Sequence, residues 1–275
     1  EEEQAENFRK IFVAMAKDIR VIIIKLADRL HNMRSLNFLS KERQQRLARE
    51  TLDIYAPLAG RLGISQIKCE LEDLSLKYLE PEFFEFLVVN INQKVKERRE
   101  FVDFVVKEIN GILVESGIEG KVFGRPKHFY SIYKKMKNQH KTLDQIYDLT
   151  AVRVIVADVN ECYEIFGKIH HKWKPIPGRI KDYIATPKPN MYQSLHTTVV
   201  TDFGQIFEIQ IRTFEMDRAA EYGIAAHWKY KENKTEADDF DTRLTWIREV
   251  MEWQGGLKDS KEFLEEFRLR EMLHK

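Results

Sequence analysis

A short alternating segment, residues 205–212, carries the side chains with the clearest chemical potential. Alternate residues of an extended strand share a face, so Glu208, Gln210 and Arg212 fall on one side and three apolar residues on the other. The apolar side can pack on helices, which leaves a carboxylate, an amide and a guanidinium in one row. A solvated sheet face has the same pattern, so the segment alone predicts only a half-buried strand.

The loop before this strand adds groups that suit a nucleotide. It contains Lys181, Lys188 and the aromatic Tyr192, which we expect to be exposed. Phosphates require cations, and a purine base requires a flat partner. Two alternating runs joined by an Asp-Phe-Gly turn predict a β-hairpin after this loop. Together these features predict a nucleotide site around Glu208.

A second set of candidates lies in a segment without acidic side chains. Between Gly120 and Leu143 there are several Lys and Arg residues but no Asp or Glu. Lys127, Ser131 and Lys135 follow one another at four-residue spacing, at the start of a predicted helix whose N-terminus favours an anion. The segment predicts a phosphate site, while an RNA-binding helix or a solvated basic face remains an alternative.

A carboxylate that could hold a divalent ion precedes a buried strand. Residues 149–156 are nearly all apolar and β-branched, which predicts a central strand, with Asp148 at its start and Arg153 projecting from it. An Asp in this position is commonly a turn former. Paired with Glu208 on another strand of the same sheet, however, Asp148 would form a two-carboxylate Mg²⁺ site of the kind used in phosphoryl transfer.

The elements that must position these residues predict an α+β chain. Helical periodicity extends over residues 8–36, 40–80, 83–113, 162–173, 220–231, 242–253 and 259–273. An acidic, polar linker is expected at residues 232–241, and glycines at 111, 117 and 120 mark the passage from helices to strands.

Composition excludes several classes of protein. Lys and Arg number 45 against 44 Asp and Glu, so a net charge of +1 does not indicate a nucleic-acid or membrane partner. Two cysteines far apart, Cys69 and Cys162, argue against a disulfide framework or a thiolate zinc site and fit a cytoplasmic protein. No apolar run approaches the ~20 residues of a membrane span. The chain begins with Glu rather than Met, so we expect a fragment.

Six segments in fixed order resemble the RelA/SpoT family of (p)ppGpp synthetases and hydrolases. They are KLADRLHNMR, GRPKHFYSIYKKM, YDLTAVRVIV, GRIKDYIATPKPNMYQSLHTTV, FEIQIRT and AEYGIAAHWKYK. The resemblance covers nearly the whole chain. It implies a mixed-sheet synthetase domain similar to nucleotidyltransferases, flanked by helices. It also implies Mg²⁺-dependent transfer of pyrophosphate from ATP to the ribose 3′-hydroxyl of GDP or GTP, which releases AMP.

The resemblance also implies a role for each candidate on the ATP side. Arg125 and Arg153 would sandwich the adenine, a task that suits planar guanidinium groups. Lys127, Ser131 and Lys135 would hold the ATP phosphates.

On the acceptor side, the resemblance implies that Tyr192 stacks on guanine. Four further residues would lie near the acceptor nucleotide or its phosphates: Lys181, Lys188, Asn190 and His196. Asp148 and Glu208 would bind Mg²⁺, and Glu208 would also orient or deprotonate the attacking hydroxyl.

The hydrolase side departs from the family pattern. Residues 179–182, RIKD, are similar to the basic form of a motif found in bifunctional members. Asp28 resembles the last Mn²⁺ ligand of the family's HD domain and Asn32 its catalytic neighbour, but this sequence has no upstream His-Asp pair. His31 is no substitute, because one imidazole and one carboxylate leave the ion under-coordinated. We expect negligible hydrolase activity from this chain.

These considerations give an expected layout and function. Residues 1–80 would be a truncated all-helical HD remnant, residues 81–232 the synthetase domain, and residues 233–275 a helical linker. Mn²⁺-dependent hydrolysis and a catalytically silent nucleotide-binding module are the alternatives. The expected partners are ATP and GDP or GTP, with no membrane and no direct nucleic-acid contact. Contact with the ribosome would require C-terminal regions that this sequence lacks.

Overall fold

The computed structural model describes residues 18, 20–146 and 149–223, which form parts of two compact units. The first unit comprises residues 1–75 and 222–275, and the second comprises residues 76–221. Asp148, the acidic linker and the two helices expected after it lie outside the described residues. No helix in the described ranges is long and apolar enough to cross a membrane.

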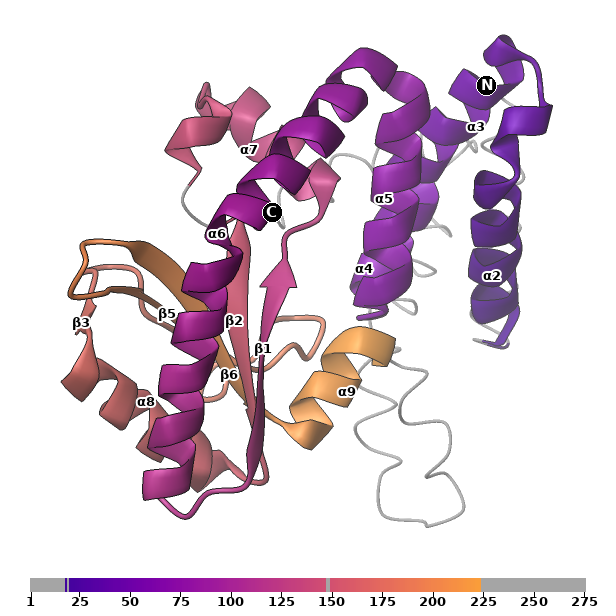
Figure 1. Ribbon diagram of the computed structural model, residues 1–275. Coiled ribbons are helices and arrows are strands. Elements are labelled where there is room, and N and C mark those ends of the chain that lie inside the picture. Colours follow the sequence, from indigo (N-terminus) through magenta and orange to yellow (C-terminus); the bar gives the residue numbers. More distant parts are fainter. Residues whose placement is uncertain (1–17, 19, 147–148, 224–275) are drawn as a thin grey trace. The chain divides into compact units, whose positions relative to one another are not determined.

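A mixed sheet forms the centre of the second unit, as the sequence predicts (Figure 1). Its strands are β1 (Gly120–Pro126), β2 (Thr150–Val156), β3 (Lys174–Pro175), β4 (Lys181–Asp182), β5 (Leu195–Val200) and β6 (Ile206–Thr213). Their order is β1-β2-β6-β5-β3, with β4 paired to β5. Only the β2–β6 pair is parallel among the described strands. The predicted hairpin is confirmed as the antiparallel β5–β6 pair, and β2 is an interior strand.

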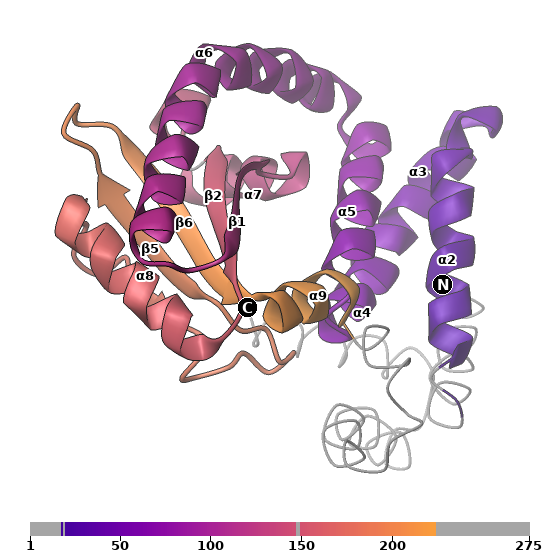
Figure 2. The same ribbon diagram turned by 60° about the horizontal axis from the view of Figure 1, so that its bottom comes forward.

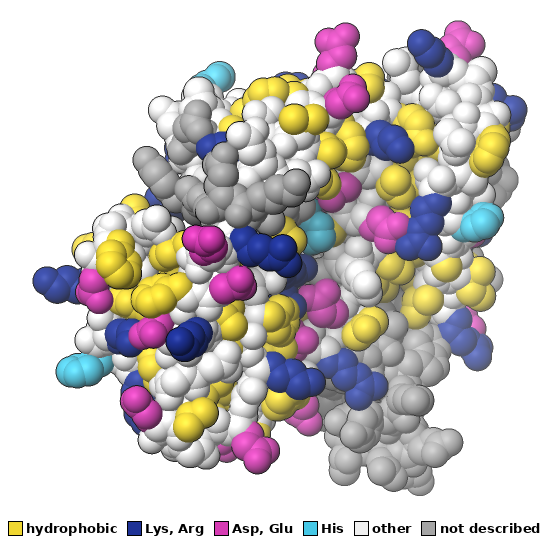
Figure 3. All heavy atoms as spheres, viewed as in Figure 1, with side chains coloured by type: hydrophobic (Ala, Val, Ile, Leu, Met, Phe, Trp, Pro, Cys, Tyr) yellow, Lys and Arg dark blue, Asp and Glu magenta, His cyan; other side chains and the backbone are white. Residues whose placement is uncertain are grey.

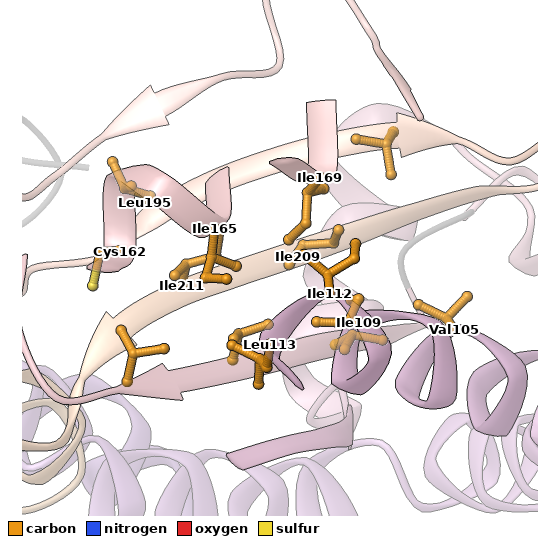
Figure 4. Packing of buried hydrophobic residues seen from close by; sticks show 14 of the residues in the cluster. Val105, Ile109, Ile112, Leu113, Cys162, Ile165, Ile169, Leu195, Ile209 and Ile211 are labelled. Atoms are coloured by element: carbon orange, nitrogen blue, oxygen red, sulfur yellow. The ribbon is translucent and has the colours of Figure 1, made fainter. Parts of the chain in front are cut away.

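Two helices, α6 (Pro81–Glu115) and α8 (Val159–Lys172), cover one face of this sheet. Figure 4 shows their side chains meeting those of the strands, with Ile109 and Leu113 from α6, Ile165 and Ile169 from α8, and Ile209 from β6. The apolar side of residues 205–212 is therefore core, and its polar side faces away from α6 and α8.

A second apolar cluster in the same unit fixes the basic helix α7 (Phe129–Gln139). Ile132 of α7 is fully buried against Leu87 and Ile91 of α6, and Leu143 and Leu149 close the cluster. Because Leu149 directly precedes β2, this packing holds the start of α7 beside the start of that strand. The backbone N–H of Lys127 donates to the carbonyl of Leu149 at 2.9 Å, which fixes the same junction.

The described part of the first unit is helical. It contains α2 (Arg20–Arg34), η1 (Leu36–Phe38), α3 (Lys41–Glu50), the π-turn η2 (Thr51–Tyr55), α4 (Ala56–Arg61) and most of α5 (Ser65–Leu79). The π-turn ends two residues before Pro57, which cannot donate a helical hydrogen bond. The helical chain therefore passes Pro57 with a widened turn rather than a break.

The outer surface over α6 and α8 carries both signs of charge. Figure 3 shows Lys and Arg interspersed with Asp and Glu on this face. Pairs such as Lys172 with Glu108 and Lys168 with Glu164 account for part of the mixture.

Candidate active site

Two cross-strand rows on the open face of the sheet bring the sequence candidates together. Residues that pair directly across neighbouring strands share a face. The first row runs through Arg125, Ala151, Glu208 and Thr198. The second row lies two positions further along and runs through Phe123, Arg153, Gln210, His196 and Lys181. Candidates from the ATP side and the acceptor side therefore lie on one face of one sheet.

Glu208 lies in the middle of the first row and is held as a carboxylate. Its Oε1 accepts a hydrogen bond from Gln210 Nε2 at 2.9 Å and lies 3.3 Å from His196 Nδ1, while the side chain is 21% exposed. Burial raises the pKa of Glu208, but the bonds from His196 and Gln210 and the nearby Lys127 charge outweigh it and lower the pKa to about 2. The carboxylate is therefore ionised at any physiological pH.

We expect acid to remove a specific part of the stability of the second unit. Glu208 has a pKa of about 2 in the folded chain against an ordinary value of 4.5, so its stabilising effect is complete above 4.5 and is lost as the pH falls through 2. The shift corresponds to roughly 3 kcal/mol. Urea titrations at several pH values should show that the free energy of unfolding of the wild-type chain exceeds that of Glu208→Gln at neutral pH. This difference should shrink as the pH falls from 4.5 through 2. A pH-independent difference would refute the assignment.

The acceptor-side candidates form a compact loop next to this carboxylate. Tyr192 Oη lies 2.8 Å from His196 Nε2, and Asn190 Oδ1 accepts a bond from the Tyr192 backbone N–H at 3.3 Å. Lys188 Nζ lies 4.7 Å from the ring centroid of Tyr183 and 5.5 Å from that of Tyr192. Tyr192 thus connects through His196 to Glu208, and Lys188 lies beside the Tyr192 ring.

The expectation that Tyr192 is exposed is wrong, because the side chain is only partly accessible. Its ring packs edge-on against Tyr183, with centroids 6.0 Å apart, and Arg212 lies 5.9 Å from its centroid. Burial raises the pKa of Tyr192 and outweighs the opposing effect of Arg212, so the phenol stays neutral. The loop sequence suggested exposure because nothing in it shows that Tyr183 and Arg212 pack on this ring.

The ATP-side candidates divide between the sheet and α7. Arg125 is 28% exposed at the end of β1, whereas the side chain of Arg153 is only 4% exposed. Nη1 of Arg153 donates to Asp217 at 3.0 Å and to Glu221 at 2.8 Å. Ser131 and Lys135 lie one turn apart on α7, as predicted. Lys127 lies close enough to Glu208 to lower its pKa, so a cation of the predicted phosphate row lies near this carboxylate.

Sequence reasoning did not assign a role to Arg212 and missed Asp217 and Glu221 entirely. Arg212 is 1% exposed on β6, and both acids lie on the following helix α9 (Phe214–Tyr222). Their four-residue spacing places them on one side of that helix. This spacing, directly after a strand with a guanidinium on its polar face, is the signal that could have identified them.

The RIKD motif is split between two tasks. Lys181 pairs with His196, so its side chain lies on the open face. Asp182 faces the other way and accepts hydrogen bonds from the backbone N–H groups of Ile184 and Ala185 and from the Tyr163 hydroxyl, each at 2.9 Å. The aspartate thus shapes the start of the acceptor loop while the lysine contributes charge to the site.

The hydrolase candidates lie in the first unit. Asp28 and Asn32 are one turn apart on α2, and both are exposed. Arg29 beside them bonds Glu50 at 2.7 Å and lies 4.0 Å from the Tyr55 ring centroid. No group of three His, Cys, Asp or Glu side chains suited to a metal occurs within the described residues.

Glu208 fits a Mg²⁺ ligand by its chemistry. It is an ionised oxygen donor on the open face, which is the ligand type that this ion prefers. Its expected partner Asp148 lies outside the described residues, although the Lys127–Leu149 bond fixes the backbone immediately after it.

Comparisons with known proteins identify two regions of the chain. A family model described as "Region found in RelA / SpoT proteins" matches residues 124–235, and one described as "HD domain" matches residues 1–65. A GTP pyrophosphokinase of Myxococcus xanthus is 57% identical over 96% of this chain and 35% of its own length. The bifunctional (p)ppGpp synthase/hydrolase RelA of Mycobacterium tuberculosis is 46% identical over 96% of this chain and 37% of its own length. The chain spans about a third of these relatives.

Among solved structures, the small alarmone synthetase 1 of Bacillus subtilis bound to its product pppGpp is 23% identical. This match covers 60% of this chain and 97% of that one, with a TM-score of 0.42. A GTP pyrophosphokinase family protein of Streptococcus pneumoniae is 24% identical over 65% of this chain and 96% of that one, also with a TM-score of 0.42.

Proposed function

We propose that this chain, which matches the RelA / SpoT family model over residues 124–235, is a member of that family. In this proposal it transfers pyrophosphate from ATP to the 3′-hydroxyl of GDP or GTP and releases AMP. The observation that carries this proposal is the position of Glu208. An ionised carboxylate lies between Lys127 and the Tyr192–His196 pair, so it can meet both a phosphate chain and an acceptor nucleoside. Transfer between two bound nucleotides depends mainly on such positioning and on cations around the phosphates.

In the proposed reaction, the acceptor 3′-oxygen forms a bond to the β-phosphorus of ATP while the bond from that phosphorus to the α-phosphate bridging oxygen breaks. Lys127, Ser131 and Lys135 would hold the phosphates, and Arg125 with Arg153 would hold the adenine. Bound Mg²⁺, with Glu208 and Asp148 as its expected ligands, would offset phosphate charge.

Glu208 would act first by orienting the acceptor. A carboxylate with a pKa of about 2 is a weak base, so it accepts a hydrogen bond from the 3′-hydroxyl and takes the proton only as the new bond forms. Lys181, Lys188, Asn190 and His196 would contact the acceptor nucleotide, with Tyr192 beside the guanine. Tyr192 can stack there only if its ring moves from its present packing on Tyr183 or offers its second face.

Hydrolysis of (p)ppGpp is the second candidate function, and the HD match over residues 1–65 favours it. The layout that we propose keeps the two activities apart, with residues 1–80 as the HD part and residues 81–232 as the synthetase. Asp28 would be a Mn²⁺ ligand in a complete HD site. We still expect negligible Mn²⁺-dependent release of pyrophosphate by this chain.

The reaction predicts AMP release that depends on a guanosine nucleotide. With the chain, Mg²⁺ and ATP, AMP should accumulate when GDP or GTP is added and not with CDP or without acceptor, because a pyrimidine offers Tyr192 a smaller ring to stack on than guanine does. Chromatography of the nucleotides measures this directly. AMP release that is equal with and without GDP would indicate an ATP pyrophosphohydrolase instead. Tight nucleotide binding without AMP would indicate a binding module.

A further inference from the structure

One carboxylate of α9 connects three arginines of the second unit. Glu221 Oε1 lies 2.8 Å from Nη1 of Arg153, 3.5 Å from Nη1 of Arg125 and 3.6 Å from Nη2 of Arg212. The neighbouring acid Asp217 lies 3.0 Å from Arg153 and 2.7 Å from Arg212. Glu221 thus bridges the two arginines that the proposed function assigns to adenine, which stand on the adjacent strands β1 and β2.

The fold fixes where Glu221 can lie. Strand β6 passes directly into α9 (Figure 2). Thr213 Oγ1 accepts a hydrogen bond from the backbone N–H of Met216 at 3.1 Å, which caps the new helix. Met216 packs against the core cluster and Ala220 is buried, so that side of α9 is anchored. Asp217 and Glu221 lie one turn apart on the neighbouring flank of α9 and are held against Arg125 and Arg153 of the open face.

The acids of α9 offset the positive charge of these arginines. Arg153 and Arg212 are both almost fully buried, and burial followed by the repulsion from Arg153 lowers the pKa of Arg212 despite its acidic neighbours. Two acids against three arginines leave an excess positive charge. In addition, Nε and Nη2 of Arg153 have no hydrogen-bond partner within the described part of the chain. Buried donors of this kind usually meet a ligand or water, and a nucleotide can supply the acceptors.

We propose that Glu221 is a positioning residue for ATP, holding the guanidinium groups of Arg125 and Arg153 at the spacing and tilt that admit an adenine ring. The proposal rests on the proposed function. A guanidinium has several rotatable bonds behind it, and an unrestrained pair would have to be ordered when ATP binds. A fixed carboxylate between them removes that cost in advance.

This role and a purely electrostatic role predict opposite results when the charge is removed. Without the Glu221 charge the site becomes more positive, so Coulomb attraction alone would bind a triphosphate more tightly. Loss of the bridge would instead weaken stacking on the adenine. Inorganic tripolyphosphate, which has phosphates but no base, separates the two effects.

The test measures binding of ATP, GDP and tripolyphosphate by calorimetry to wild-type, Glu221→Gln and Glu215→Gln chains. Glu215 is an exposed acid on the same helix and serves as the matched control. We expect Glu221→Gln to weaken ATP binding about tenfold, the scale of one lost stacking contact. Binding of tripolyphosphate should be unchanged or tighter, binding of GDP should change less than about twofold, and Glu215→Gln should match wild type. ATP binding as tight as wild type, or weakened equally with GDP, would overturn the proposal.

A second variant protects the test against loss of folding. Glu221→Asp keeps the charge but is one methylene shorter, so it cannot span both arginines, and it should also weaken ATP selectively. If Glu221→Gln melts below the assay temperature, this variant decides the matter alone. Combining Glu221→Gln with Arg125→Ala should add little to the loss of ATP affinity caused by Arg125→Ala, because Glu221 then no longer holds two arginines together. An additive loss of ATP affinity would also count against the proposal. The proposed function is tested separately, by nucleotide binding and pyrophosphate transfer of the wild-type chain, whereas the Glu221 proposal is tested by the affinities of the variants relative to wild type.

Discussion

Glu208→Gln is expected to lower the rate of pyrophosphate transfer by about 10³-fold while leaving nucleotide binding within a factor of about three. The amide has the shape of the carboxylate and can keep a hydrogen bond to Gln210, which donates to Glu208 at 2.9 Å. It loses the negative charge that His196 and Lys127 stabilise. The hydroxyl acceptor and the proposed Mg²⁺ ligand therefore disappear together, whereas the arginines and Tyr192 remain.

The measurement is a single-turnover transfer assay beside equilibrium binding of each nucleotide. Glu164→Gln is the matched control, because Glu164 is a half-exposed acid on α8 that pairs with Lys168 on the far side of the sheet. It should transfer like wild type. A Glu208→Gln chain that retained more than a tenth of the wild-type rate would show that Glu208 is not the group that orients the attacking hydroxyl.

Asp217→Ala is expected to destabilise the second unit by about 3–5 kcal/mol, the usual cost of leaving a buried charge without its partner. Asp217 lies 3.0 Å from Arg153 and 2.7 Å from Arg212, and these side chains are 4% and 1% exposed. Without it, Glu221 is the one acid within the described residues that still pairs with both buried arginines. Urea unfolding followed by fluorescence measures the effect, and the exposed neighbour Glu215→Ala should cost no more than about 1 kcal/mol.

A compensating variant makes this prediction specific. Burial outweighs the attraction of the nearby acids and lowers the pKa of Arg212, so its charge is unfavourable where it lies. Adding Arg212→Met to Asp217→Ala removes an uncompensated buried charge and should recover most of the lost stability. If the double variant were as unstable as the sum of the two single variants, Asp217 would stabilise the unit in some way other than by pairing with Arg212.

The sequence predicted the elements whose pattern is local. The alternation of residues 205–212 predicted both faces of β6, because its apolar positions form the core with α6 and α8. The acid-free segment predicted the helix α7, on which Ser131 and Lys135 lie one turn apart. Hydrophobic periodicity and charge bias are properties of residues that are close in sequence, so they can be recognised without knowledge of the tertiary fold.

Contacts between distant residues could not be predicted in this way. Arg153 and Glu221 are 68 positions apart, and their bond depends on the parallel pairing of β2 with β6 and on the direct turn into α9. The same pairing buries Arg153 and Arg212, although guanidinium groups in a strand usually suggest exposure. Burial of Tyr192 likewise depends on Tyr183 and Arg212, which the loop sequence does not place beside it.

The central claim is that one face of this sheet binds both nucleotides and joins them at Glu208. The most direct measurement follows label from [γ-³²P]ATP in the presence of GDP and Mg²⁺ and locates it in the products. We predict that wild-type chain places the label on the ribose 3′-position of the guanosine nucleotide as pyrophosphate, with one AMP formed for each transfer. Label found only in free phosphate or pyrophosphate, with GDP unchanged, would contradict the account.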